Sequence, residues 1–207
     1  MIKLWGRNTS SNVAKVIWLL EELGLQYQRV DAGGSFGGTD TPHYRAMNPL
    51  GLVPALEEDD FTLFESNAIL RYICNAHAAH STLYPQALHA RATVEAWMDF
   101  QQTSLSRHQS IAFHGLVRIA PEKRDNAAIA AAINEAARIW AILDARLASH
   151  PYIVGDDITL ADIAFGPHVH RWFNMSFERL AAPDLHAWYQ RLLARPAFKA
   201  NCAGPLV

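Results

Sequence analysis

The chain has 207 residues, half of them hydrophobic, and a formal net charge of -2 at pH 7. That length is enough for one large domain or two small ones, and the absence of a basic run argues against nucleic-acid and anionic-membrane partners. The two cysteines, Cys74 and Cys202, are predicted to be buried free thiols in a reducing compartment. Because no stretch has the length of a membrane span and Met1 to Trp5 lacks a signal-peptide core, we expect a soluble cytoplasmic protein.

The first part of the chain alternates predicted strands and helices. Apolar residues at helical spacing from Val13 end at Gly24, and two short apolar segments joined by Glu57 to Asp60 predict a hairpin. We predict strands over residues 2–5, 26–31, around 53–54 and 61–64, and helices over 13–23 and 67–76, with a glycine-rich loop and a short helical piece before residue 53. This βαβαββα order predicts an α/β thioredoxin-like N-terminal domain over residues 1–80.

A proline-containing linker over residues 81–86 precedes a second part with no predicted strand. Helices are expected from 87 to about 117, with a possible kink, from 126 to 149, after a capping box at Thr159 and Asp162, and between Pro183 and Pro196. The prediction is an all-α C-terminal domain over residues 88–207.

Two neighbouring segments of the first part carry the strongest chemical signal. Val53-Pro54 is a candidate cis bond, because a strand tolerates proline only at an edge, a first residue or a bulge. Ser66 is expected to be the N-cap of the following helix, whose free amides and dipole attract anions. The alternative interpretation of Glu65-Ser66 is a solvent-exposed glutamate followed by a helix N-cap, with no role in binding a ligand.

Together with Ser10-Ser11-Asn12, residues 48–54 and residues 155–162, these segments resemble the cytosolic glutathione transferases, from Met1 to about Phe198. The closest pattern is a bacterial theta-like or nu-like member with a serine or asparagine active site. The resemblance implies a glutathione transferase fold and activity, typical of detoxification, and a homodimer. It also implies that glutathione is the co-substrate and that the helical domain forms a pocket for a small hydrophobic electrophile.

The resemblance also implies roles for individual residues in binding glutathione. Ser66 would hold the γ-glutamyl carboxylate, Glu65 would face the ammonium group, and the Val53 backbone beside Pro54 would pair with the cysteinyl residue. Leu52 stands where many members have a lysine or arginine. For the glycyl carboxylate, His43, Arg45 or a loop amide are the substitutes that the sequence offers.

Thiol activation would fall to Ser10 or Asn12, with Thr9 and Ser11 close enough in sequence to exchange roles. The alternative for Ser10 is a simple helix N-cap. The loop has no tyrosine and the helix start has no cysteine, which argues against the tyrosine-type and cysteine-type members. The expected electrophile pocket draws on three aromatic residues, although aromatic side chains at helical spacing are more often core residues: Trp97, Phe100 and Phe113.

Two other functions stay open from the sequence. A glutathione-dependent disulfide reductase or peroxidase is favoured by Asn12, and a non-catalytic interaction module is favoured by Leu52. A metal site is not expected, since His77 and His80 form a helical pair without a supporting cysteine or carboxylate cluster.

Overall fold

The computed structural model describes residues 1–207 and begins with a four-stranded sheet. Its strands are β1 (Ile2–Trp5), β2 (Tyr27–Val30), β3 (Ala55–Glu58) and β4 (Phe61–Phe64), in the spatial order β2-β1-β3-β4. β1 runs parallel to β2 and antiparallel to β3, and β3 and β4 form an antiparallel hairpin. The predicted element order and the thioredoxin-like N-terminal domain are confirmed.

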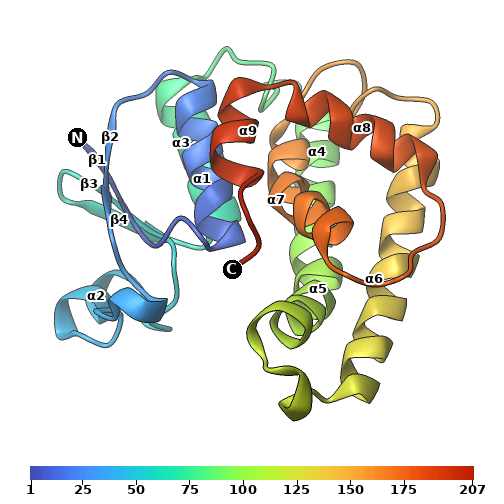
Figure 1. Ribbon diagram of the computed structural model, residues 1–207. Helices are drawn as coiled ribbons and strands as arrows, with labels where there is room; N and C mark the ends of the chain where they lie inside the picture. The colour runs from blue at the N-terminus through green and yellow to red at the C-terminus, as the bar shows by residue number, and fades with distance from the viewer.

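Helices cover both faces of this sheet. They are α1 (Ser11–Glu22), α2 (Pro42–Met47) and α3 (Ser66–His77), with a 3-10 turn at Gly34–Phe36 before α2. Leu4 and Leu56 pack into the large buried cluster with α1 and α3, whereas the adjacent Trp5 and Ala55 pack with α2. Successive strand side chains point to opposite faces, so the two clusters mark the two sides of the sheet. Figure 1 shows α1 and α3 between the sheet and the second, helical half.

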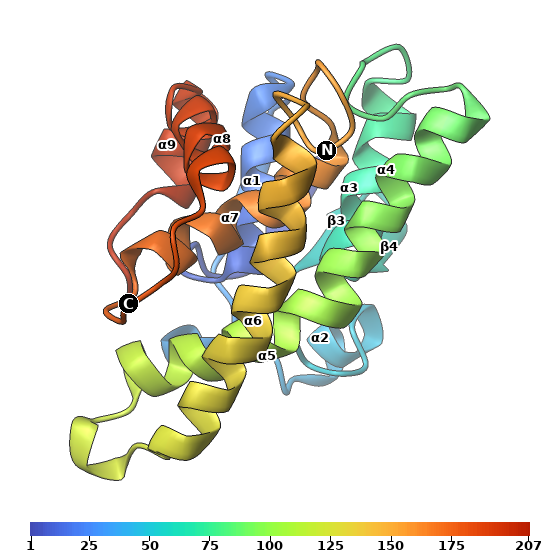
Figure 2. The ribbon, with the colours of Figure 1, turned by 90° about the vertical axis from the view of Figure 1, so that its right-hand side faces the viewer.

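The second half contains helices and no sheet. They are α4 (Leu88–Phe100), α5 (Ser106–Phe113), α6 (Asn126–Leu147), α7 (Leu160–Asn174), α8 (Pro183–Leu193) and α9 (Pro196–Cys202). Figure 2 shows α4 and α5 following one another beside the long α6. The helix expected from 87 to about 117 is divided by two wide π-helical turns, Gln101–Leu105 and His114–Arg118. None of the helices combines the length and the apolar character that a membrane span requires.

Two boundaries differ from the sequence-based expectation. Ser66 is the first residue of α3, and Glu65 is its N-cap. Pro196 does not close the last helix but stands at the start of a further one, α9, where its missing N–H is no loss. The predicted boundary between residues 80 and 88 stays a prediction.

The predicted capping box at the start of α7 is present, and its acidic residue, Asp162, is completely buried. Asp162 Oδ2 accepts hydrogen bonds from the Thr159 amide at 2.8 Å and the Thr159 hydroxyl at 3.1 Å. Its Oδ1 accepts from the Ile153 amide at 3.0 Å and from Trp188 Nε1 at 2.9 Å. One carboxylate therefore fixes the start of α7, the preceding loop and α8.

α1 is the element that joins the two halves. Every residue from Val13 to Leu20 is buried, because α1 packs against α3 on one side and against α7 and α9 on the other. A single buried hydrophobic cluster consequently runs from the sheet into the helical half.

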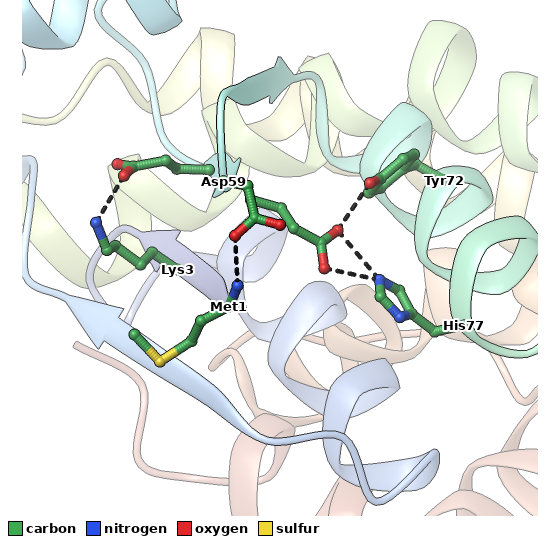
Figure 3. A network of polar contacts seen from close by, with 7 residues as sticks. Met1, Lys3, Asp59, Tyr72 and His77 are labelled. Carbon is green, nitrogen blue, oxygen red and sulfur yellow. Dashed lines mark hydrogen bonds and ion pairs between the residues drawn. The ribbon is translucent and has the colours of Figure 1, made fainter.

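A polar network ties the β3–β4 hairpin to its neighbours (Figure 3). Lys3 Nζ lies 2.6 Å from Glu57 Oε1, and the Met1 ammonium lies 2.9 Å from Asp59. Glu58 accepts a hydrogen bond of 2.7 Å from the Tyr72 hydroxyl on α3 and lies 3.1 Å from His77 Nε2. These contacts hold the hairpin against β1 and α3, at the other end of α3 from Ser66.

Candidate functional site

The N-terminus of α1 presents hydrogen-bonding groups that the chain leaves unused. Ser10 occupies the N-cap position with an extended backbone, yet its side chain makes no cap hydrogen bond. The backbone amides of Ser11 and Asn12 have no acceptor within the chain, as expected for the first turn of a helix. The Asn12 Oδ1 atom is buried and has no partner. The hydrogen bond expected of Ser10 as a simple helix cap is therefore absent. Four groups remain for a ligand, namely the Ser10 hydroxyl, the amides of Ser11 and Asn12, and Asn12 Oδ1.

The Val53 backbone is a second unused group. The Val53-Pro54 peptide bond is cis, as the sequence suggests. Neither the Val53 amide nor its carbonyl pairs with another group of the chain. The preceding carbonyl, of Leu52, accepts from the Tyr44 hydroxyl at 2.7 Å and from Asn48 Nδ2 at 2.8 Å. The loop is thus fixed just before the point where its backbone becomes available to an extended ligand.

Gly6 brings α1 and the Val53 loop together. A Cβ at Gly6, where φ is +151°, would lie 2.5 Å from Val13 Cγ2 and 3.2 Å from Val53 Cβ. Only glycine fits between these two side chains. The unused groups of α1 and of Val53 consequently belong to one site.

The N-terminus of α3 lies at the same end of the sheet as Val53, because Ala55, which follows Pro54, pairs with Phe64, which precedes Glu65. Glu65 has φ +69° and ψ 111°, a backbone conformation that non-glycine residues adopt rarely and that clusters at functional positions. The Ser66 hydroxyl makes no hydrogen bond, and the amides of Ser66 and Asn67 have no acceptor in the chain. Ser66 is buried and Glu65 is exposed. The helix start can therefore receive an anion, with a carboxylate beside it for a cation.

Lys15 lies beneath the start of α3. No sequence motif identifies it as a site residue. It is completely buried, and its Nζ lies 3.4 Å from Asn67 Oδ1 and 2.8 Å from Gln101 Oε1. Gln101 Nε2 in turn lies 3.2 Å from His168 Nε2. Burial lowers the pKa of Lys15 to about 7, while the negative charge of Glu65 opposes that shift. A lysine inside the apolar run from Val13 to Leu20 is the one signal that the sequence carries for it.

A cavity of about 410 Å³ opens between the two halves in front of α1. Its lining contains three arginines and a histidine but no acidic residue, and only Leu52 and Val53 are hydrophobic. The lining residues are Arg7, Ser10, Ser11, Asn12, Gly33, Gly34, Thr39, Gly51, Leu52, Val53, Ser110, His114, Arg118 and Arg171. Ser10 also borders a neighbouring cavity of about 260 Å³.

Arg171, on α7, connects the helical half to the start of α1. Its Nη1 donates to Ser11 Oγ at 3.2 Å and its Nη2 donates to the Thr9 carbonyl at 2.8 Å. Its guanidinium lies 3.9 Å from the centre of the Phe113 ring. Burial, followed by repulsion from Arg118 and Arg7, lowers the pKa of Arg171 to about 10. Sequence reasoning misses this contact, because Arg171 and Ser11 are 160 positions apart.

Several predicted site residues lie away from this cavity. His43 packs edge-on against Trp5 at 5.6 Å, and Arg45 donates to the Pro49 carbonyl at 2.7 Å. Trp97 and Phe100 pack against each other and against Phe165 within the helical half. Of the three predicted pocket aromatics, Phe113 borders the smaller of these two cavities, and Trp97 and Phe100 border neither. The ligand-binding roles of these residues, and of Pro54, stay predictions.

Two family models match the chain, that of the glutathione S-transferase N-terminal domain over residues 1–75 and that of the C-terminal domain over residues 126–191. The chain belongs to the glutathione S-transferase family. This transferase is 43% identical to glutathione S-transferase GstB of Escherichia coli K12, over 96% of both chains. It is 33% identical to glutathione S-transferase 3 of Zea mays, over 98% of this chain and 93% of the relative.

Among solved structures, this glutathione S-transferase is similar to the theta-class glutathione S-transferase of Xanthomonas axonopodis pv. citri with glutathione bound. The TM-score is 0.95 and the identity 43%, with 100% of this chain and 99% of that chain covered. The resemblance to a bacterial theta-like member and the two-part fold predicted from the sequence are thereby confirmed.

Proposed function

We propose that this glutathione S-transferase binds reduced glutathione in extended form and stabilises its thiolate with Ser10 or Asn12 for attack on an electrophilic centre. The observation that carries the proposal is the set of unused groups at one site. The Ser10 hydroxyl, the Asn12 side chain and the first amides of α1 stand beside the free Val53 backbone in the same cavity.

The peptide part of glutathione is assigned to the other unused groups. The γ-glutamyl carboxylate accepts from the Ser66 hydroxyl and the first amides of α3, and Glu65 faces the ammonium group. The Val53 amide and carbonyl pair with the cysteinyl backbone like an added strand. This arrangement places the sulfur at the start of α1. The similar Xanthomonas glutathione S-transferase has glutathione bound, which supports glutathione as the ligand.

Thiolate stabilisation is the chemical step that the α1 groups perform. A free thiol has a pKa of about 8.5, so only a few per cent is thiolate at neutral pH. One hydrogen bond to a charged group contributes about 1.5 to 3 kcal/mol, which corresponds to about one to two pKa units. A hydroxyl or amide donor together with the α1 amides is therefore sufficient to make the thiolate the main species.

The test is a pH titration of bound glutathione, followed by the ultraviolet absorbance of the thiolate. We expect an apparent thiol pKa about two units below the free value in the unmodified protein. The Ser10→Ala and Asn12→Ala variants identify which group contributes, and their combination should raise the pKa toward the free value, although the α1 amides remain. Ser176→Ala, at an exposed position outside both cavities, is the matched control.

Other outcomes assign other functions. Binding without a pKa shift indicates a non-catalytic module, and unchanged turnover in the combined Ser10 and Asn12 variant contradicts the thiolate role. Turnover of a small disulfide by the protein with Asn12 unchanged indicates the disulfide reductase alternative. That chemistry would use the glutathione thiolate alone, because burial raises the pKa of Cys74 to about 12 and that of Cys202 well above the ordinary value.

A further inference from the structure

We propose that the cavity selects acceptors that carry an anionic group, such as a carboxylate, and that Arg7 and Arg118 bind this group beside the glutathione sulfur. This inference rests on the proposed function, because it names the substrate class of the same site. It departs from the hydrophobic electrophile that the sequence resemblance implies.

The cavity has positive charge without counter-charge. Arg7, Arg118 and Arg171 border it and none of them contacts an aspartate or glutamate, whereas four other arginines of the chain pair with side-chain carboxylates within 4.0 Å. No aspartate or glutamate lines the cavity. Mutual repulsion among these cations is unfavourable in the free protein and is relieved when an anion enters.

The histidine in the lining responds to the same field. Burial lowers the pKa of His114, and the charges of Arg118, Arg171 and Arg7 lower it further. Its Nε2 lies 3.5 Å from Arg118 Nη1. His114 is therefore neutral near pH 7 and is a hydrogen-bonding group rather than an additional cation.

The three arginines differ in what holds them. Arg171 is fixed by Ser11, the Thr9 carbonyl and the Phe113 ring. Its positive charge contributes to the electrostatic potential of the cavity, but it has few free donors for a ligand. Arg118 is exposed and lies 5.0 Å from the Phe113 ring centre. It donates to the Val207 carbonyl at 3.1 Å and 3.3 Å, and its Nη1 lies 3.5 Å from His114 Nε2.

The Arg7 side chain lies against the glycine-rich loop, and its guanidinium makes no hydrogen bond, although the Arg7 backbone bonds to Ala32 and Ser10. A Cβ at Gly34 would lie 3.0 Å from Arg7 Cδ, and one at Gly33 would lie 3.2 Å from Arg7 Nη1. Both glycines also have positive φ, at +75° for Gly33 and +60° for Gly34. The loop therefore accommodates the guanidinium, which keeps its donors for a ligand. Arg7 and Arg118 together provide an anion site.

Arg7 and Arg118 are the lining guanidinium groups that keep donors for an acceptor, because Arg171 is already held by Ser11, the Thr9 carbonyl and the Phe113 ring. Arg118 and Arg171 come from the helical half, the side from which an acceptor approaches a sulfur held at the start of α1.

The reaction that this arrangement serves is a displacement at carbon. The thiolate sulfur forms a bond to a carbon atom of the acceptor, and the bond from that carbon to its leaving group breaks. The leaving group departs as an anion with the bonding electron pair. The arginines hold the acceptor's carboxylate and take no part in the bond changes, so Arg7 and Arg118 act as binding residues.

The first test compares the binding of two thioethers that differ only in charge, S-carboxymethylglutathione and S-carbamoylmethylglutathione. Titration calorimetry should give a dissociation constant about tenfold lower for the carboxylate, the lower end of what one charge-assisted hydrogen bond contributes. Arg118→Gln and Arg7→Gln should each reduce this preference. Arg107→Gln, an exposed position on α5 outside both cavities, should retain it.

The outcomes separate the two proposals. If neither thioether nor glutathione binds, the proposed function itself fails. If both thioethers bind equally well, glutathione binding stands and the anionic acceptor is overturned.

The second test uses the alkylating pair iodoacetate and iodoacetamide, with each rate divided by the uncatalysed rate. We expect iodoacetate to be favoured, and Arg118→Gln to raise KM for iodoacetate about tenfold while leaving iodoacetamide unchanged. An equal loss for both reagents, with a raised pKa of bound glutathione, would mean that the arginines stabilise the thiolate and would overturn the proposal. Alkylation of the protein is slow, because both cysteines are buried.

Discussion

Lys15 Nζ lies 2.8 Å from Gln101 Oε1, and this contact joins α1 to the turn that follows α4 inside the protein. Neither partner is exposed, and no carboxylate pairs with the lysine. A buried cation without an ion pair is costly, so its protonation state affects the stability of the whole fold.

We expect stability to rise with pH because of Lys15. Its pKa falls from 10.5 to about 7 on folding, so between these values the unfolded chain binds more protons than the folded one. Below about pH 7 the lysine is protonated in both states and the full cost of burying the charge is present. As pH rises toward 10.5 this cost is relieved, by a total on the order of 5 kcal/mol.

Urea unfolding at pH 6, 7.5 and 9, at one protein concentration, measures this dependence. Lys15→Met should flatten the rise between pH 7 and 9, whereas Lys199→Met, at an exposed position on α9, should not. The same slope in both variants would show that Lys15 does not titrate in this range.

Ser66→Ala should weaken glutathione binding more than turnover. It removes a hydroxyl that has no partner within the chain, and we expect the dissociation constant to rise about tenfold, as for one lost hydrogen bond to a charge. Turnover at saturating glutathione should stay nearly unchanged, since the interaction is the same in ground and transition states. Calorimetry and initial rates, with Ser176→Ala as control, make the comparison. Full affinity in Ser66→Ala would remove the carboxylate from this helix start.

Asp162→Ala should destabilise the protein by about 3 to 5 kcal/mol, because it leaves the buried donors of Thr159, Ile153 and Trp188 without an acceptor. Chemical denaturation provides the measurement, and Asp156→Ala, at an exposed position of the same loop, is the control. The surviving folded fraction should bind glutathione with unchanged affinity. A loss of affinity at unchanged stability would contradict a structural role.

Gly166→Ala should cost about 1 to 3 kcal/mol, the usual range for overpacking a core. The added Cβ would lie 2.4 Å from Trp18 Cζ3 and 3.0 Å from Phe198 Cε2, where α7 crosses α1 and α9. Gly204→Ala, where a Cβ meets nothing within 4 Å, is the control for thermal unfolding. Equal melting temperatures for the two variants would indicate that the two aromatic rings move aside freely.

Local signals in the sequence suffice for most of the fold. The apolar spacing that ends at Gly24 predicts α1, and the Thr159–Asp162 capping box predicts the start of α7. Pro196 is misleading, because a proline ends one helix as readily as it begins the next. Ser66 is displaced by one position, since Glu65 adopts a backbone conformation that residue type alone does not indicate.

The site divides in the same way. Ser10 and Val53 are near in space because β1, which precedes α1, pairs with β3, which follows Val53, and the sequence pattern predicts both strands. The arginines are beyond its reach, since Arg118 and Arg171 approach α1 only after the helical half has packed. For Lys15, in contrast, the sequence does contain a signal. A charged residue in a buried apolar run indicates a polar partner elsewhere in the chain.

The burial of α1 on all sides also bears on how the protein can be divided. Although the linker near residue 80 separates two parts in the sequence, α1 belongs to the interiors of both. A polypeptide that ends at residue 80 would expose Trp18 and its apolar neighbours to water, and we expect it to aggregate rather than fold. Exchange of the helical half between relatives should succeed only where the residues facing Lys15 and Trp18 are exchanged with it.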